Sequence, residues 1–162
     1  VLTGNYPYNI SSQIFFKMLD NMALIPCCTG MLQREVAQRI CAAPGSRSYG
    51  ILSVLIQAWY DAEYLFTVRP EVFNPPPKVH SAVIRLTRNG RESLGCNPEL
   101  FKRIVKGTFN QRRKMLRNSI RSCVEKDVPL PACQWLDKRP EQLSVEDFIE
   151  LTNIIEASRS QS

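Results

Sequence analysis

The sequence predicts an α/β unit followed by an all-α unit, and three observations support this fold class. Val1–Asn5 is a short apolar run that leads into Pro7, which is typical of a buried strand entering a loop. Apolar residues then recur at helical spacing from Ile14 to Met22. Beyond residue 97 all apolar patterns have helical spacing, so the last third is expected to contain no strand.

The remaining elements follow from spacing and from breaking residues. We expect further strands at 27–33, 63–68 and 82–86, and helices beginning near Ser11 or Ser12, spanning 36–41 and spanning 51–59. The three prolines of Phe73–Val79 predict a stiff, extended connection between the last two strands.

The C-terminal third begins after a polar, glycine-bearing stretch. Asn97 and Pro98 fit an N-cap and a first helical residue, and they open one helix whose apolar positions continue to Ile120. A short helix is expected at 132–136, and Ser144 to Asp147 resembles a capping box at the start of a last helix. We therefore expect an α/β domain at 1–88, a linker at 89–97 and a helical domain at 98–162.

Positive charge is concentrated in one segment. The chain carries a formal net charge of +6, and residues 98–124 hold eight Lys and Arg against Glu99 alone. Clustered cations gain affinity for a phosphate backbone by releasing its condensed counterions, which favours a polyanionic partner. The alternative interpretation is a solvated helix face.

Other classes of protein fit the sequence poorly. The best apolar run, Ser48–Tyr60, stops at Asp61 and is too short to cross a membrane. The six cysteines form no C-x-x-C pair, and His80 is the single histidine, so we expect reduced thiols rather than a metal site or a disulfide framework.

The sharpest motif is Asn5-Tyr6-Pro7-Tyr8 at the carboxyl end of the first strand, where open α/β sheets bind ligands. An exocyclic adenine amine is a poor nucleophile because its lone pair is delocalised into the ring. The Asn5 amide oxygen and the Tyr6 carbonyl, turned outward by Pro7, can accept its two hydrogens, and Tyr8 can stack on the base, an interaction worth about 1–3 kcal/mol. The alternative is a proline turn with two packed tyrosines.

Five segments together carry a family resemblance. They are Asn5–Ser11, Met31–Ala37, Pro44–Gly50 with Leu52–Val54, Phe73–Val79 with Ser81–Val83, and Phe109–Lys114 with Arg117–Ser119. In this order they resemble the small-subunit ribosomal RNA adenine dimethyltransferase family, from Asn5 to about Ile155. The resemblance implies the C-terminal part of a Rossmann-like methyltransferase sheet followed by a small helical domain. It also implies transfer of two methyl groups from S-adenosylmethionine to each of two adjacent adenosines near the end of small-subunit RNA.

The resemblance also implies roles for individual residues. Asn5, Pro7 and Tyr8 match the target-adenine motif, with Asn5 also next to the cofactor, and Phe73 matches the aromatic that faces the flipped base. It implies no metal and no covalent intermediate. The partner that it implies is small-subunit ribosomal RNA in the assembling subunit, in the cytoplasm. The expected RNA contacts are Arg34, Arg112, Arg113, Lys114 and Arg117.

The chain departs from the family pattern in three ways. Tyr6 stands where Leu or Ile is usual, and His80, which we interpret as a surface or strand-entry residue, stands where Asp is common. The seven glycines contain no G-x-G, so the family's cofactor loop is absent from this sequence, as is the acidic residue for the cofactor's ribose. We therefore expect a C-terminal portion that is inactive alone and exposes an unpaired sheet edge.

Two other functions remain open. The first is a non-enzymatic RNA-binding or ribosome-assembly module, which has no need for an amide beside a stacking aromatic at a strand end. The second is a large-subunit RNA adenine methyltransferase of the antibiotic-resistance type, against which Phe109–Lys114 favours the small-subunit family. A DNA adenine methyltransferase fits less well, because a duplex reader needs further recognition elements.

Overall fold

The structure is a computed structural model that describes residues 1–7 and 11–161. The chain forms two compact units: unit 1 comprises Val1–Ala42 and Trp59–Arg91, and unit 2 comprises Ala43–Ala58 and Glu92–Ser162. The sequence-based division placed all of 1–88 in one domain, whereas the contacts assign residues 43–58 to the helical unit. Helical spacing identifies the apolar face of this segment but does not say which element covers it.

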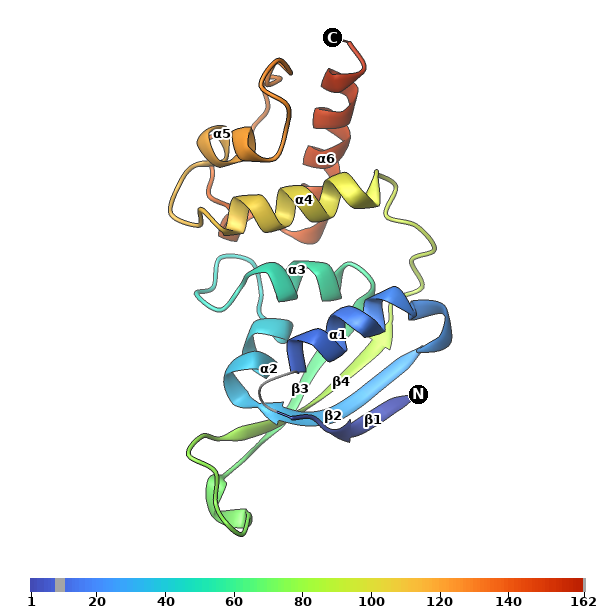
Figure 1. The fold of residues 1–162 in the computed structure, drawn as a ribbon, viewed down its shortest axis with the longest axis vertical. Coiled ribbons are helices and arrows are strands. Elements are labelled where there is room, and N and C mark those ends of the chain that lie inside the picture. The colour runs from blue at the N-terminus through green and yellow to red at the C-terminus, as the bar shows by residue number, and fades with distance from the viewer. Residues whose placement is uncertain (8–10, 162) are drawn as a thin grey trace. The chain divides into compact units, whose positions relative to one another are not determined.

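Unit 1 is built on a four-stranded mixed sheet (Figure 1). The strands are β1 (Leu2–Asn5), β2 (Cys27–Gln33), β3 (Tyr60–Val68) and β4 (Ser81–Arg88), in the order β1-β2-β4-β3. β1 pairs with β2 in parallel, and β4 is antiparallel to both of its neighbours. The four expected strands are therefore confirmed, the last two being longer than expected.

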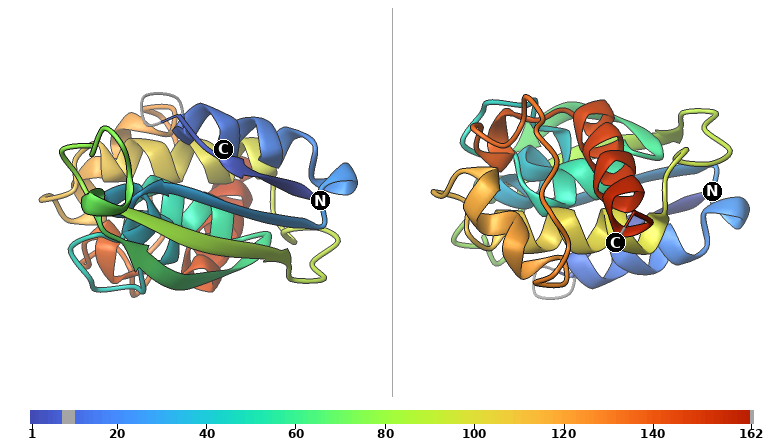
Figure 2. Two further views of the ribbon diagram at one scale, coloured as in Figure 1. Left: turned by 90° about the horizontal axis from the view of Figure 1, so that it is seen from below. Right: turned by 90° about the horizontal axis from the view of Figure 1, so that it is seen from above.

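The helices α1 (Ser11–Asp20) and α2 (Arg34–Cys41) cover one face of this sheet, and a 3₁₀ turn spans Met22–Leu24 (Figure 2, left). Alternate residues of β4 are buried on the covered face, namely Ala82, Ile84 and Leu86. The sequence predicted a buried first strand, but three of the four β1 residues are exposed, because β1 is the edge strand of the described sheet.

Unit 2 is helical, as expected. It contains α3 (Ile51–Gln57), α4 (Pro98–Phe109), α5 (Leu116–Ser119) and α6 (Val145–Arg159), with 3₁₀ turns at Ile120–Ser122 and Pro140–Gln142. Three rings form part of its core: Tyr49 meets Phe109 edge-on at 6.0 Å between centroids, and Phe109 lies 5.8 Å from Phe148.

Two helix predictions in this unit are wrong. The single helix from Pro98 to Ile120 ends at Phe109, and residues 110–115 form a turn. Residues 132–136 form no helix. The carbonyls of Leu136 and Lys138 instead accept hydrogen bonds from the Arg117 and Leu116 amides, at 2.9 and 2.8 Å. The segment thus satisfies the first amides of α5, which is a long-range pairing that helical periodicity does not reveal.

The predicted capping box of α6 is confirmed. The Ser144 hydroxyl accepts from the Asp147 amide at 3.2 Å, and the Asp147 carboxylate accepts from the Ser144 amide at 3.0 Å. We expect Ser144→Ala to lower the free energy of unfolding by about 1 kcal/mol in urea titrations. Ser160→Ala, at the other end of the helix, serves as the control. Equal losses in the two variants would contradict a capping role.

Candidate functional site

The strand β1 delivers Asn5 and Tyr6 to the carboxyl edge of the sheet. Asn5 is in register with Met31 of β2, and the Tyr6 amide donates to the Met31 carbonyl at 2.9 Å. The ladder therefore continues one residue beyond the strand. The Asn5 residue is exposed, and within the described part of the chain its side-chain amide has no hydrogen-bond partner.

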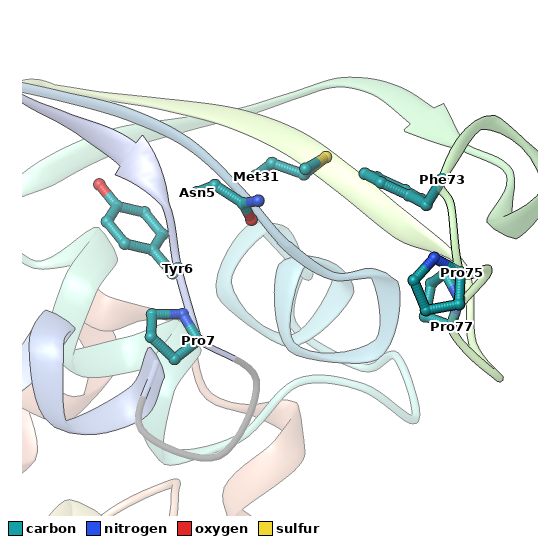
Figure 3. A pocket seen from close by; sticks show the side chains of 7 residues that line it. All are labelled: Asn5, Tyr6, Pro7, Met31, Phe73, Pro75 and Pro77. Atoms are coloured by element: carbon teal, nitrogen blue, oxygen red, sulfur yellow. The ribbon is translucent and has the colours of Figure 1, made fainter.

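A pocket of about 330 Å³ opens at this edge (Figure 3). Asn5 and Met31 lie between Tyr6 and Pro7 on one side and the β3–β4 connection on the other. That connection contributes the Phe73 ring with Pro75 and Pro77. The structure thus brings Phe73 to Asn5, Tyr6 and Pro7, from which it is separated by at least 66 positions in the sequence. The sequence had linked these residues only through the family resemblance.

Three lining residues were not identified from the sequence: Met31, Pro75 and Pro77. Met31 could have been found from the parallel pairing of the first two strands, which sets it opposite Asn5. The prolines belong to a stretch predicted to be stiff. Because proline fixes its own φ angle, they restrict the backbone of the segment that carries Phe73 without hydrogen bonds to a neighbouring strand. Tyr8, the other expected stacking residue, lies outside the described residues.

Tyr6 anchors the loop beneath the pocket. Its ring is buried and meets Phe15 edge-on at 5.6 Å, and its hydroxyl lies 3.0 Å from the Cys28 sulfur. Burial raises the pKa of the Tyr6 phenol and also that of the Cys28 thiol, so both groups stay protonated at neutral pH. The ring also occupies the space above Gly30, where a Cβ atom would collide with it.

This arrangement can hold a flat base that carries an amine. The Asn5 amide oxygen offers an acceptor without a partner in the described chain, and the Phe73 ring and the prolines offer an apolar wall. Base stacking on an aromatic ring contributes about 1–3 kcal/mol. The sheet edge therefore combines one polar, orienting group with apolar surface, which is typical of small-ligand sites.

Arg112 has structural partners in unit 2. Its guanidinium donates to the carbonyls of Ser46 and Arg47, at 3.3 and 2.9 Å, and to the Glu141 carboxylate at 3.1 Å. It also lies 5.8 Å from the centre of the Phe109 ring. The expected role of Arg112 in gripping phosphate must therefore compete with these bonds, which hold residues 46–47 to the turn after α4.

The other expected RNA contacts are exposed. Arg113 and Lys114 lie in the turn between α4 and α5, whereas Arg117 lies on α5 and forms an ion pair with Asp137. Arg34 is exposed at the start of α2, and its amide donates to the His80 carbonyl at 3.0 Å. His80 is half-buried and immediately precedes β4.

Two observations on the described residues concern membrane-spanning helices and metal ligands. None of their helices has both the length and the apolar composition to cross a bilayer. Among residues 1–7 and 11–161, no three His, Cys, Asp or Glu side chains gather as a set of metal ligands.

Sheet order, edge loop and helical unit together define the class: a Rossmann-like methyltransferase fold with an appended helical unit. The family model described as "Ribosomal RNA adenine dimethylase" matches residues 1–157, and the chain belongs to that family.

Two curated relatives carry the name "Ribosomal RNA small subunit methyltransferase A". The protein of Bacteroides fragilis is 72% identical over 156 residues, which are 96% of this chain and 57% of that protein. The protein of Flavobacterium johnsoniae is 56% identical over 161 residues, which are 99% of this chain and 61% of that protein. The chain thus spans little more than half the length of these relatives.

Two solved structures share the fold. A dimethyladenosine transferase from Plasmodium falciparum superposes with a TM-score of 0.82 at 24% identity, over 97% of this chain and 66% of that chain. The 23S rRNA methyltransferase ErmE superposes with a TM-score of 0.62 at 22% identity, over 93% of this chain and 64% of that chain. At these identities the likeness shows the fold alone.

Proposed function

We propose that this chain contributes the target-base site and an RNA-binding unit to a methyltransferase that dimethylates two adjacent adenosines of small-subunit ribosomal RNA. The observation that carries the proposal is the pocket itself. There the Asn5 amide, which has no hydrogen-bond partner among the described residues, meets an aromatic wall at a strand end. Family membership and the curated relatives support ribosomal RNA as the substrate. Such a substrate would place the enzyme in the cytoplasm with the assembling small subunit.

The proposed chemistry depends mainly on positioning. The Asn5 amide oxygen and the Tyr6 carbonyl accept the two hydrogens of the adenine amine and draw its nitrogen towards a tetrahedral geometry. Phe73 packs against the flipped base, and Tyr8 is proposed to cover the opposite face. Holding two reacting groups in this way supplies several kcal/mol without a strong base, at most about 7–11 kcal/mol.

The cofactor implied by the family is S-adenosylmethionine, whose sulfonium supplies an electrophilic methyl group. The residues present fit its reactive end: Asn5 provides a polar contact, and Tyr6, Pro7 and Phe73 surround the pocket with apolar atoms. The sequence has no G-x-G loop for the rest of the molecule. We therefore propose that residues outside this sequence carry most of the cofactor's binding energy.

A transfer assay tests the proposal. The full-length gene product is incubated with labelled S-adenosylmethionine and a synthetic small-subunit RNA hairpin that contains two adjacent adenosines. We expect label in both adenosines as dimethyladenine, and no label in an RNA with guanosines at these positions. Tight binding of the RNA without transfer would instead support the non-enzymatic assembly module.

Arg112 is expected to behave differently from the pair formed by Arg113 and Lys114. Arg113→Ala with Lys114→Ala should lower the slope of log affinity against log salt by about 1.4–1.8 if each residue contacts one phosphate, without changing stability. Arg112→Ala should instead lower the free energy of unfolding by about 1–2 kcal/mol, because it leaves Glu141 and two carbonyls without their donor. Filter binding at several salt concentrations and urea unfolding check the two effects. An unchanged slope in the double variant would show that Arg113 and Lys114 are solvated surface residues that do not contact phosphate.

A further inference from the structure

A second cavity, of about 280 Å³, lies where β2 passes into α2. Its walls come from the β2–α2 junction and from the end of the β3–β4 connection: Gln33, Arg34, Glu35, Gln38, Val79 and His80. Sites for complete small molecules usually measure about 300–1,000 Å³. This cavity is at the lower limit, so it suits one part of a polymer better than a whole free ligand.

The two cavities are neighbours along the same structural elements. Met31 lines the target-base pocket and Gln33 lines the second cavity, and both lie on the half-exposed face of β2. Residues two apart on a strand are about 6.6 Å apart. The β3–β4 connection also serves both, through Phe73 in the first and His80 in the second. A nucleic-acid strand that follows this edge meets the two cavities in succession.

The lining of the second cavity is polar and carries one available cation. In the described part of the chain, the exposed Arg34 guanidinium has no ion-pair partner. The Glu35 carboxylate is held by Arg39 at 2.7 Å, which offsets its charge. The side chains of Gln33 and Gln38 add amide donors and acceptors. A guanidinium fork matches the oxygens of a phosphate, and amides suit ribose hydroxyls.

We propose that this cavity binds the ribose and phosphate of the nucleotide next to the target adenosine, with Arg34 on the phosphate. The inference rests on the proposed function, because it needs an RNA whose adenosine enters the first pocket. The second of two adjacent adenosines would place its ribose and phosphate in this cavity while the first is being modified.

The test uses methyl transfer by the full-length gene product to a synthetic RNA hairpin with two adjacent adenosines. Arg34→Ala is expected to raise KM about tenfold, the loss of one charge-assisted hydrogen bond, with kcat almost unchanged. Arg85→Ala removes an exposed guanidinium on β4 that lies outside the cavity, so it serves as the matched control and should leave KM unchanged. Thermal unfolding of each variant shows whether the fold is retained.

RNA chemistry then locates the contact. In two further hairpins, a neutral methylphosphonate replaces the phosphate on one or the other side of the target adenosine. We expect one of them to abolish the KM difference between the wild type and Arg34→Ala. A difference that persists in both hairpins, or equal effects of Arg34→Ala and Arg85→Ala, would overturn the inference while the proposed function stands. Absence of methyl transfer by the wild type would contradict the proposed function, and this inference with it.

Discussion

Asn5→Ala in the full-length gene product is expected to reduce kcat for methyl transfer by about 100- to 1,000-fold, as does removal of one preorganised polar group from other active sites. The reason is geometric. Asn5 ends β1 with an exposed side chain that has no partner in the described chain, so its amide oxygen is available to the substrate amine. RNA affinity should stay within a few-fold, because the basic residues that we propose to contact phosphate lie elsewhere.

Two variants sharpen this experiment. Asn5→Asp keeps an acceptor oxygen but adds a charge, and it should retain more activity than Asn5→Ala. Thr3→Ala removes an exposed side chain two residues earlier on the same strand and should have no effect. If Asn5→Ala transfers methyl groups at the rate of Thr3→Ala, Asn5 does not accept the amine.

Gly30→Ala is expected to be the most damaging small substitution in the sheet. An added Cβ would collide with the Tyr6 ring and lie 2.6 Å from the Gly4 carbonyl oxygen, so the backbone or the ring must move. Overpacking of this kind costs about 1–3 kcal/mol, and sometimes more. Because Tyr6 directly follows Asn5, the same displacement should also lower methyl transfer. Urea unfolding and the transfer assay measure the two effects.

The neighbouring strand offers a matched control. Gly4 pairs with Gly30 across the parallel ladder, but a Cβ at Gly4 would make only an ordinary 3.7 Å contact with the Tyr6 ring. Gly4→Ala should therefore be tolerated. Tyr6→Leu should rescue Gly30→Ala only in part, because the contact with the Gly4 carbonyl remains. Equal stability of Gly4→Ala and Gly30→Ala would show that the ring does not rest on Gly30 as described.

Features that depend on residues close together in the chain were predicted best. The caps at Asn97 and Ser144 rest on side-chain bonds to amides two or three residues away, and both are present. The strand at 27–33 was located within its correct bounds from its own residues. The prediction that one helix continues to Ile120 is wrong, because the end of α4 depends on distant partners. The carbonyls of Leu136 and Lys138 accept hydrogen bonds from the first amides of α5, and the Glu141 carboxylate binds Arg112.

The fold class, the four strands and the Asn5-Tyr6-Pro7-Tyr8 motif could be predicted from the sequence, because each depends on composition, spacing or ordered motifs along the chain. Three features depend on tertiary contacts: Met31 and Phe73 share a pocket with Asn5, residues 43–58 belong to the helical unit, and Arg112 has internal partners. These features could not be predicted, because strand order, register and ion pairing join residues that are far apart in the chain. No local pattern specifies such pairs.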